Sequence, residues 1–180
     1  MALGATVIRL ALPDFPSLAL AGLALSGLGA YWIRESIVRA HGQAVERKAI
    51  ATLKVPPGWV ATSNVMLNGG GDLDVLIVGT DASGTPWRYA VEIKSFESAM
   101  LRRNLLTGSE AIVKIDGRAL PPGVIRQTLA AAVEVQGTPV LWLPRASGQS
   151  FAMKCGVVVV PGNARALKKA LRIPTSGLFG

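Results

Sequence analysis

Charged side chains interrupt two neighbouring apolar runs of the sequence. Asp72 and Asp74 lie at the start of one run, and Glu92 and Lys94 lie in the next run along the chain. Burying such charges is costly unless a cation or a substrate compensates for them. Carboxylates form a hard-oxygen site suited to Mg²⁺ or Mn²⁺, and a nearby lysine can stabilise a phosphate charge or help to deprotonate a metal-bound water. These groups are sufficient for phosphodiester cleavage without a covalent nucleophile.

Two β-strands are expected to position these residues. Tyr, Val and Ile are frequent at 72–79 and 87–95, which predicts strands, and the turn-rich link 80–86 would let the two strands pair. Because strand side chains alternate between the two faces, Glu92 and Lys94 leave the same face. Pairing of these strands would therefore bring the acids and the lysine together.

The rest of the pattern predicts a mixed α/β domain with a central sheet. The stretch 96–122 is polar and irregular, and we expect it to hold short helices or to contact a substrate. The other expected elements are a helix at 34–54, a strand at 59–67, a helix at 124–135, strands at 138–144 and 156–160, and a helix at 164–171 capped by Asn163.

Composition excludes several classes of protein. Half of the 180 residues are hydrophobic and 17% are charged, which is typical of a folded globular domain. The net charge of +8 indicates a polyanionic partner, either nucleic acid or anionic lipid. Cys155 is the only cysteine, so an intramolecular disulfide is excluded. We expect Cys155 to be buried. Because His41 is the only histidine, a His/Cys zinc site and any mechanism that needs two histidines are also excluded.

Residues 15–33 contain no charged side chain. A helix of this length, at about 1.5 Å per residue, just spans the roughly 30 Å hydrocarbon core of a membrane. Tyr31 and Trp32 lie at its end, as in an aromatic belt. We therefore predict that residues 1–34 form an N-terminal hydrophobic, transmembrane segment and that residues 35–180 form the α/β domain. A buried Ala/Gly-rich helix and a cleaved signal peptide are the alternatives.

The flanking residues predict the orientation of this segment. Four basic residues follow it closely, namely Arg34, Arg39, Arg47 and Lys48. The positive-inside rule then places the domain in the cytoplasm, held at the cell inner membrane by a single pass, with a cytoplasmic protein as the alternative. Gly22, Ser26 and Ala30 recur every four residues, which would permit close helix packing in a homo-oligomer.

Asp74 in "LDVLIV" and the Glu-x-Lys of "YAVEIKS" together resemble the PD-(D/E)xK nuclease superfamily, and most closely its nuclease-related NERD domain. The stretch from Gly42 to Glu46 is similar to the family's first helix, and Gln127 is similar to a glutamine on its following helix. The resemblance covers about residues 40–172. It departs from the family pattern at Leu73, which replaces the proline, and in the somewhat long link between the two strands.

The resemblance implies a restriction-endonuclease-like core, with a helix, a three-stranded hairpin sheet, a helix, two strands and a helix in that order. It implies that Asp74 and Glu92 hold Mg²⁺ or Mn²⁺, with the Ile93 carbonyl as a third ligand. Lys94 would orient or activate the attacking water. Asp72 competes with Asp74 for the ligand role. The two remaining implied residues are Gln127, which would position Lys94 or the substrate, and Glu46, which would bind metal or anchor the first helix.

Five basic residues are candidates for contacts with phosphate, which set affinity without reading sequence: Arg102, Arg103, Lys114, Arg118 and Arg126. The expected function is a Mg²⁺-dependent endonuclease that acts on DNA at the cytoplasmic face of a membrane. The alternative is a non-catalytic module that uses the same fold to bind nucleic acid or a partner beside the membrane.

Overall fold

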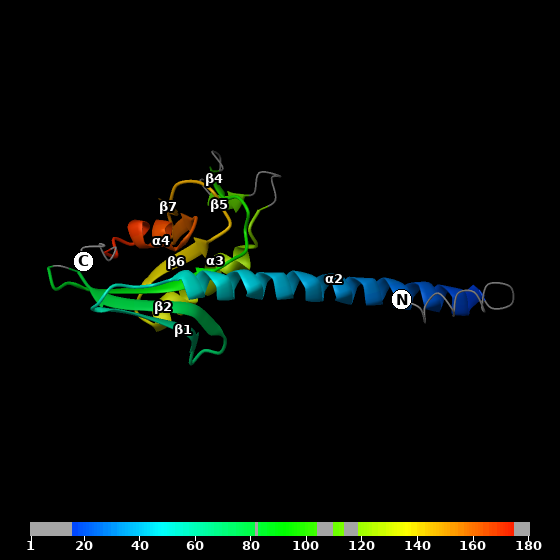
Figure 1. The fold of residues 1–180 in the computed structure, drawn as a ribbon. Helices are drawn as coiled ribbons and strands as arrows, with labels where there is room; N and C mark the ends of the chain where they lie inside the picture. The colour runs from blue at the N-terminus through cyan, green and yellow to red at the C-terminus, as the bar shows by residue number, and fades with distance from the viewer. Residues whose placement is uncertain (1–15, 82, 104–109, 114–118, 175–180) are drawn as a thin grey trace. The chain divides into compact units, whose positions relative to one another are not determined.

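The computed structural model of the chain describes residues 16–81, 83–103, 110–113 and 119–174 (Figure 1). Its internal contacts divide the chain into two units, Met1–Ala44 and Val45–Gly180. The helix α2 (Pro16–Thr52) contributes residues to both units, and the second unit contains every strand.

Helix α2 is continuous across the point where we predicted that an apolar segment would meet a second helix. Gly42, within the helix predicted at 34–54, does not interrupt α2. Between residues 23 and 38 the helix exposes large hydrophobic side chains, which are Leu23, Leu25, Leu28, Tyr31, Trp32, Ile33, Ile37 and Val38. In the part of the chain that the structure describes, no helix has the length and apolar character needed to cross a membrane.

The second unit is built on a mixed six-stranded sheet with the order β1-β2-β3-β6-β8-β7. Its strands are β1 (Trp59–Met66), β2 (Asp72–Thr80), β3 (Pro86–Ile93), β6 (Thr138–Leu143), β7 (Phe151–Ala152) and β8 (Val158–Pro161). The pairs β1–β2, β2–β3 and β7–β8 are antiparallel, whereas β3–β6 and β6–β8 are parallel. The predicted α/β class with a central sheet is therefore confirmed.

Two layers of helix cover the sheet. Helix α3 (Pro122–Glu134) packs Ala131 and Ala132 beside Leu73 and Ala90. A different cluster joins Ala49 near the end of α2 and Leu167 of α4 (Ala164–Ala170) to inward-facing residues of β2, β3 and β6. Asn163 caps α4 as predicted, because its side chain accepts hydrogen bonds from the N–H groups of Arg165 and Ala166.

Close packing at the far end of the β1–β2 ladder depends on a glycine. Trp59 is paired with Gly79 across the ladder. A Cβ atom at Gly79 would lie 2.2 Å from Cδ2 of the Trp59 ring, closer than real side chains approach. The ring of Trp59 also stacks on Tyr89, with 6.3 Å between ring centroids. Gly79 therefore lets a buried aromatic ring lie flat against the sheet.

Two expectations about loops are corrected. In its described part, the stretch 96–122 forms a second, two-stranded antiparallel sheet from β4 (Met100–Arg103) and β5 (Glu110–Val113), where we expected short helices. Contact of this stretch with a substrate stays a prediction. Cys155 is exposed, although we expected it to be buried. It follows the short strand β7, which occupies part of a segment predicted to be a loop.

Candidate active site

The paired strands β2 and β3 bring Asp74 and Glu92 together. The ladder ends at the pair Val75–Val91, and the two acids are the next residues outward on their strands. Both side chains are buried, with 7% of Asp74 and 1% of Glu92 exposed. The Ile93 N–H donates a hydrogen bond to Oδ2 of Asp74 at 2.6 Å, which fixes the carboxylate of β2 against the backbone of β3.

Lys94 satisfies only half of the Glu92 carboxylate. Its Nζ atom donates to Oε1 of Glu92 at 2.6 Å, and its side chain is 34% exposed. The second oxygen, Oε2, is buried and has no hydrogen-bond partner among the described residues. An unpaired oxygen of a buried carboxylate is costly, and such atoms call for an explanation such as a bound ion. Glu92 is therefore the acid in this cluster whose surroundings are incomplete.

Glu46 and Asp72 complete an acidic cluster. Glu46, on the last part of α2, is partly buried and shares a side-chain hydrogen bond with Asp74. Asp72 is exposed at the start of β2, and its negative charge acts on Glu46, Asp74 and Glu92 alike. Four acids and Lys94 thus influence one another from three segments of the chain.

Burial dominates the electrostatics of the three inner acids. Loss of solvation raises the pKa of Glu92, and the charge of Asp74 raises it further despite the bond from Lys94. Burial also raises the pKa of Asp74, outweighing the bond from the Ile93 N–H. Burial and then the charge of Asp74 raise the pKa of Glu46. The cluster therefore disfavours its own negative charge, and a bound cation would relieve this.

Lys94 remains charged in this environment. Burial alone would lower its pKa, but the hydrogen bond and charge of Glu92, together with the charges of Asp74 and Glu46, outweigh burial and raise it. A lysine that holds its proton this firmly is suited to stabilising negative charge and is a poor general base at neutral pH.

The donor chemistry fits a hard divalent cation. Asp74 and Glu92 offer carboxylate oxygens, and Oε2 of Glu92 has no other partner within the described chain. Across residues 16–81, 83–103, 110–113 and 119–174, however, no three His, Cys, Asp or Glu side chains converge closely enough to form a ready metal cage. The fit therefore rests on two carboxylates, as is common for Mg²⁺ sites that retain several waters.

Gln127 lies apart from this cluster in its contacts. It is exposed on α3, and the hydrogen bonds of the described residues do not connect it with Lys94. The role that the family resemblance implies for Gln127 stays a prediction.

The expected phosphate contacts are spread over several elements. Arg102 is exposed on β4, and Arg103 is the last residue of that strand. Arg126 is exposed on α3 and lines a hollow of about 580 Å³ beside β5. Lys114 and Arg118 lie outside the described residues.

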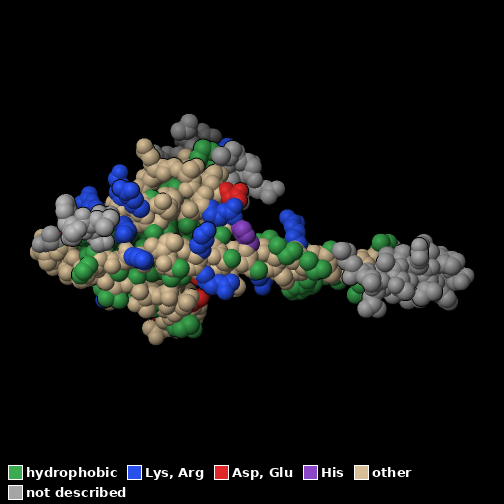
Figure 2. All heavy atoms as spheres, viewed as in Figure 1, with side chains coloured by type: hydrophobic (Ala, Val, Ile, Leu, Met, Phe, Trp, Pro, Cys, Tyr) green, Lys and Arg blue, Asp and Glu red, His purple; other side chains and the backbone are tan. Residues whose placement is uncertain are grey.

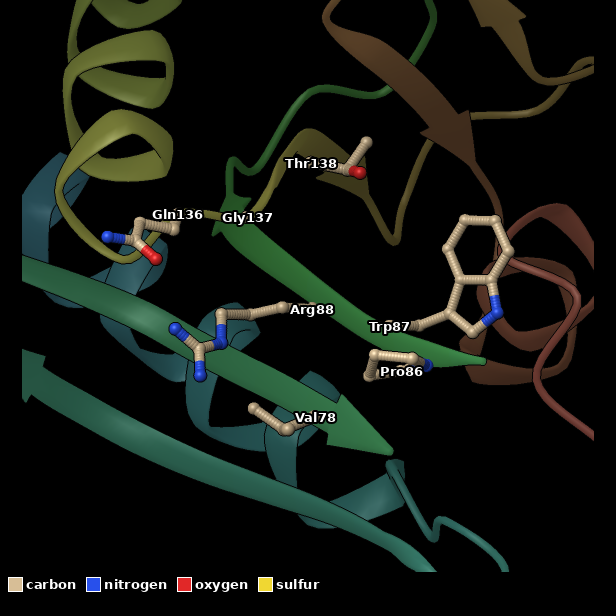
Figure 3. A pocket seen from close by; sticks show the side chains of 7 residues that line it. All are labelled: Val78, Pro86, Trp87, Arg88, Gln136, Gly137 and Thr138. Carbon is tan, nitrogen blue, oxygen red and sulfur yellow. The ribbon is translucent and has the colours of Figure 1, made fainter. Parts of the chain in front are cut away.

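A separate hollow of about 410 Å³ lies where β3 and β6 begin, at the opposite end of β3 from Glu92 (Figure 3). Trp87 and Arg88 project in different directions from β3 in this view, as expected for consecutive strand residues. The lining residues are Val78, Pro86, Trp87, Arg88, Gln136, Gly137 and Thr138. None of the acids of the cluster lines this hollow.

Sequence reasoning undervalued Glu46. Read from the helical pattern alone, it is placed near the edge of the apolar stripe, where most glutamates are solvated. In the structure, Ala49 and Leu53 both pack into the core, three and seven residues after Glu46. That spacing puts Glu46 on the helix face that packs against the core. The spacing is therefore the signal in the sequence that indicates a partly buried Glu46.

Comparison with known proteins identifies no relative of this chain. It matches no protein-family model, and no curated protein and no solved structure matches it.

Proposed function

We propose that the protein is a metal-dependent endonuclease of the PD-(D/E)xK type that acts on DNA at the cytoplasmic face of a membrane. The observation that carries this proposal is the buried Oε2 atom of Glu92, which has no partner in the described chain although its carboxylate lies beside Asp74 and Lys94. A divalent cation would give that oxygen a partner and would offset the charge of both carboxylates.

The order of elements supports a nuclease-like core. Helix α2 precedes the antiparallel strands β1, β2 and β3. After these strands come α3, the parallel strands β6 and β8, and finally α4. This order agrees with the restriction-endonuclease-like core implied by the family resemblance. The finer fold assignment is part of the proposal, because fold order alone does not establish function.

Asp74 and Glu92 would hold Mg²⁺ or Mn²⁺. Such an ion, when bound, supplies Lewis-acid stabilisation of the charge on the phosphate. The Ile93 N–H holds Asp74 in place, so the backbone of β3 orients one ligand while its own side chain Glu92 supplies the other. Glu46, which is partly exposed and interacts with Asp74, would support that ligand from the solvent side.

Lys94 would act on the substrate as a cation. Its raised pKa keeps the ammonium group protonated, so it can donate to a phosphate oxygen and stabilise the charge that develops there. To do so, its Nζ would exchange part of its contact with Glu92 for the phosphate. Lys94 would therefore act electrostatically on the phosphate.

The second candidate is a non-catalytic module that binds nucleic acid or a partner. The 2.6 Å contact between Lys94 and Glu92 favours it, since an ion pair of this kind already neutralises one carboxylate without metal. Under this alternative, DNA binding would fall with salt and would depend neither on Glu92 nor on divalent cations.

Nicking of supercoiled plasmid by the full chain separates the two candidates. We expect open-circular DNA in Mg²⁺ or Mn²⁺ and none in EDTA, with loss of nicking in Glu92→Ala and in Lys94→Ala. Glu97→Ala is the matched control, because Glu97 is an exposed acid that pairs with Arg145 at 2.5 Å outside the cluster. Full nicking by Glu92→Ala would exclude the nuclease proposal.

Residues 15–33 would attach the protein to the membrane. The support for this attachment is the row of exposed hydrophobic side chains on α2, including Leu25 and Trp32, followed by Arg34. We expect the full chain to sediment with membranes and to resist extraction at high pH. Release by high salt alone would contradict an apolar anchor. Association through Gly22, Ser26 and Ala30 stays a prediction.

A further inference from the structure

Two segments of the second unit carry an excess of positive charge. Residues 47–58 include the end of α2, and residues 161–174 include α4. Neither segment contains an acidic residue. Together they hold Arg47, Lys48, Lys54, Arg165, Lys168, Lys169 and Arg172, which is seven of the nineteen Lys and Arg residues of the chain.

The fold brings these segments side by side. Nζ of Lys168 donates to the backbone carbonyl of Lys54 at 3.2 Å. Beneath this contact, Leu53 packs against the core cluster that contains Leu167 and Leu171. Residues more than a hundred positions apart in the sequence thus form one basic surface, which we define by Lys54, Lys168, Lys169 and Arg172.

Among the described residues, no carboxylate forms an ion pair with Lys54, Lys168, Lys169 or Arg172. Glu35, Glu92 and Glu97 pair with cations elsewhere. Lys54, Lys169 and Arg172 are exposed, and Figure 2 shows Lys and Arg side chains over the α4 part of the molecule. The charges of Arg172 and Asp81 both act on Tyr89, so Asp81 lies near one edge of the basic surface. The carboxylate of Asp81 accepts hydrogen bonds from donors of its own loop.

The basic surface begins next to the acidic cluster. Arg47 directly follows Glu46 on α2, which ends at Thr52, and Lys54 is the second residue after that end. From Glu46 to Thr52 the helix rises by about 9 Å at 1.5 Å per residue. This rise corresponds to roughly two to three nucleotides along one DNA strand at 3.4 Å each.

The surroundings favour a nucleic-acid backbone over a lipid surface. Membrane-binding surfaces combine cations with protruding apolar side chains. Of the large hydrophobic side chains exposed among the described residues, none comes from 47–58 or 161–174. A surface with cations and no apolar contacts matches a phosphodiester chain, which is bound through charge in water.

We propose that Lys54, Lys168, Lys169 and Arg172 contact the phosphodiester backbone of the nucleic acid and lead it towards Glu46 and the acidic cluster. The substrate class rests on the proposed nuclease function. The surface itself differs from the contacts expected from sequence, because its residues lie just after α2 and on or just after α4, whereas Arg102 lies on β4 and Arg126 on α3.

Salt-dependent binding tests this assignment. The full chain is titrated against a fluorescent DNA duplex in EDTA, so that binding is measured without cleavage, over a series of KCl concentrations. Lys54→Gln/Lys169→Gln should reduce the slope of log K against log[KCl] by about 1.8, since each lost phosphate contact removes about 0.9. The matched control Arg39→Gln/Arg88→Gln removes the same charge from exposed positions on α2 and β3 and should leave the slope unchanged.

Each result decides the proposal, provided that both variants keep the wild-type melting temperature. An equal loss in both double variants, or a loss only in the control, would overturn it. So would a Lys54→Gln/Lys169→Gln variant that binds DNA normally but loses binding to vesicles containing phosphatidylglycerol. Binding through this surface without any Mg²⁺-dependent nicking would support the surface and refute the nuclease, and nicking with unchanged binding by the variant would do the reverse.

Discussion

Acidic residues lie at both ends of the β2–β3 hairpin, but their hydrogen bonding and burial differ. At the turn, Asp81 accepts hydrogen bonds from the N–H groups of Ser83 and Thr85, from the Ser83 hydroxyl and from Nε1 of Trp87. These bonds lower its pKa to about 2, the bond from Ser83 contributing most. At the other end, burial raises the pKa of Asp74 and Glu92, and one oxygen of Glu92 lacks a partner in the described chain.

Asp81 therefore completes a turn, whereas the carboxylates of Asp74 and Glu92 are buried and one of them has an oxygen without a partner in the described chain. The turn contains all the donors that Asp81 requires, so its role is structural. The cluster at Glu92 is unfavourable for the folded chain alone, and such local cost is typical of functional sites. The strands connecting the two ends are the same, so the comparison depends on the surroundings of each acid and not on its residue type.

Replacing one acid at each end of the hairpin with asparagine should give the largest difference, which is in the rate of DNA cleavage. Asp74→Asn removes a proposed metal ligand, and we expect the cleavage rate to fall by about 10²–10⁴-fold. Asp81→Asn should stay within about twofold of wild type, because the hydrogen bonds of Asp81 are made within its own turn, at the other end of the hairpin from the proposed ligands. Initial rates of plasmid nicking at fixed Mg²⁺ measure both. Comparable losses in the two variants would remove the distinction between the ends.

Packing near the turn should have the largest effect on stability. A Cβ atom at Gly79 would overlap the ring of Trp59, so Gly79→Ala should lower the free energy of unfolding by about 1–3 kcal/mol. Gly123→Ala, where nothing lies within 4 Å of the added Cβ, should be neutral or slightly stabilising. Urea denaturation compares the two variants. An unfolding free energy for Gly79→Ala equal to that of wild type would show that the ring has room to shift.

Neutral substitutions at the two ends should shift the melting temperature in opposite directions. Glu92→Gln removes a buried charge that the cluster disfavours, so the melting temperature in EDTA should rise by a few degrees. Asp81→Asn weakens the acceptor for several loop donors, so the melting temperature should fall. Thermal unfolding followed by circular dichroism measures both. A fall in Glu92→Gln would indicate that its pair with Lys94 is net stabilising.

The pH dependence of these differences should be the smallest effect. The folded pKa of Glu92 is raised above 4.5, so the stability cost of its charge is present at neutral pH and is relieved as pH falls towards 4.5. The folded pKa of Asp81 is lowered from 3.8 to about 2, so its contribution is present above 3.8 and is lost as pH falls through 2. The difference in free energy of unfolding between each neutral variant and wild type should therefore disappear in a different pH range for each variant. Convergence of the Glu92→Gln difference only below pH 3 would contradict a raised pKa.

The sheet and the pairing of the acids were predictable from sequence because local patterns determine them. Alternation in "YAVEIKS" and the turn-rich link gave the β2–β3 pair, and the predicted strands lie within a few residues of those observed. The neighbourhood of Glu92 followed from these strands.

Other features depend on contacts between distant segments. The strands β4 and β5 form in a polar stretch whose composition predicts no strand, because pairing with each other stabilises them. The hydrogen bond from Glu46 to Asp74 and the meeting of Lys54 with Lys168 require helix packing that no local pattern encodes. The apparent end of a helix at Arg34 was a change of composition, and α2 continues through it.

Binding of Mn²⁺ tests the central claim most directly, since it needs neither substrate nor cleavage. Titration of the full chain with Mn²⁺, followed by the electron paramagnetic resonance signal of the free ion, counts bound metal in wild type, Glu92→Gln and Asp81→Asn. We expect binding by wild type and Asp81→Asn, and its loss in Glu92→Gln. Equal binding by all three proteins would contradict a metal site at Asp74 and Glu92.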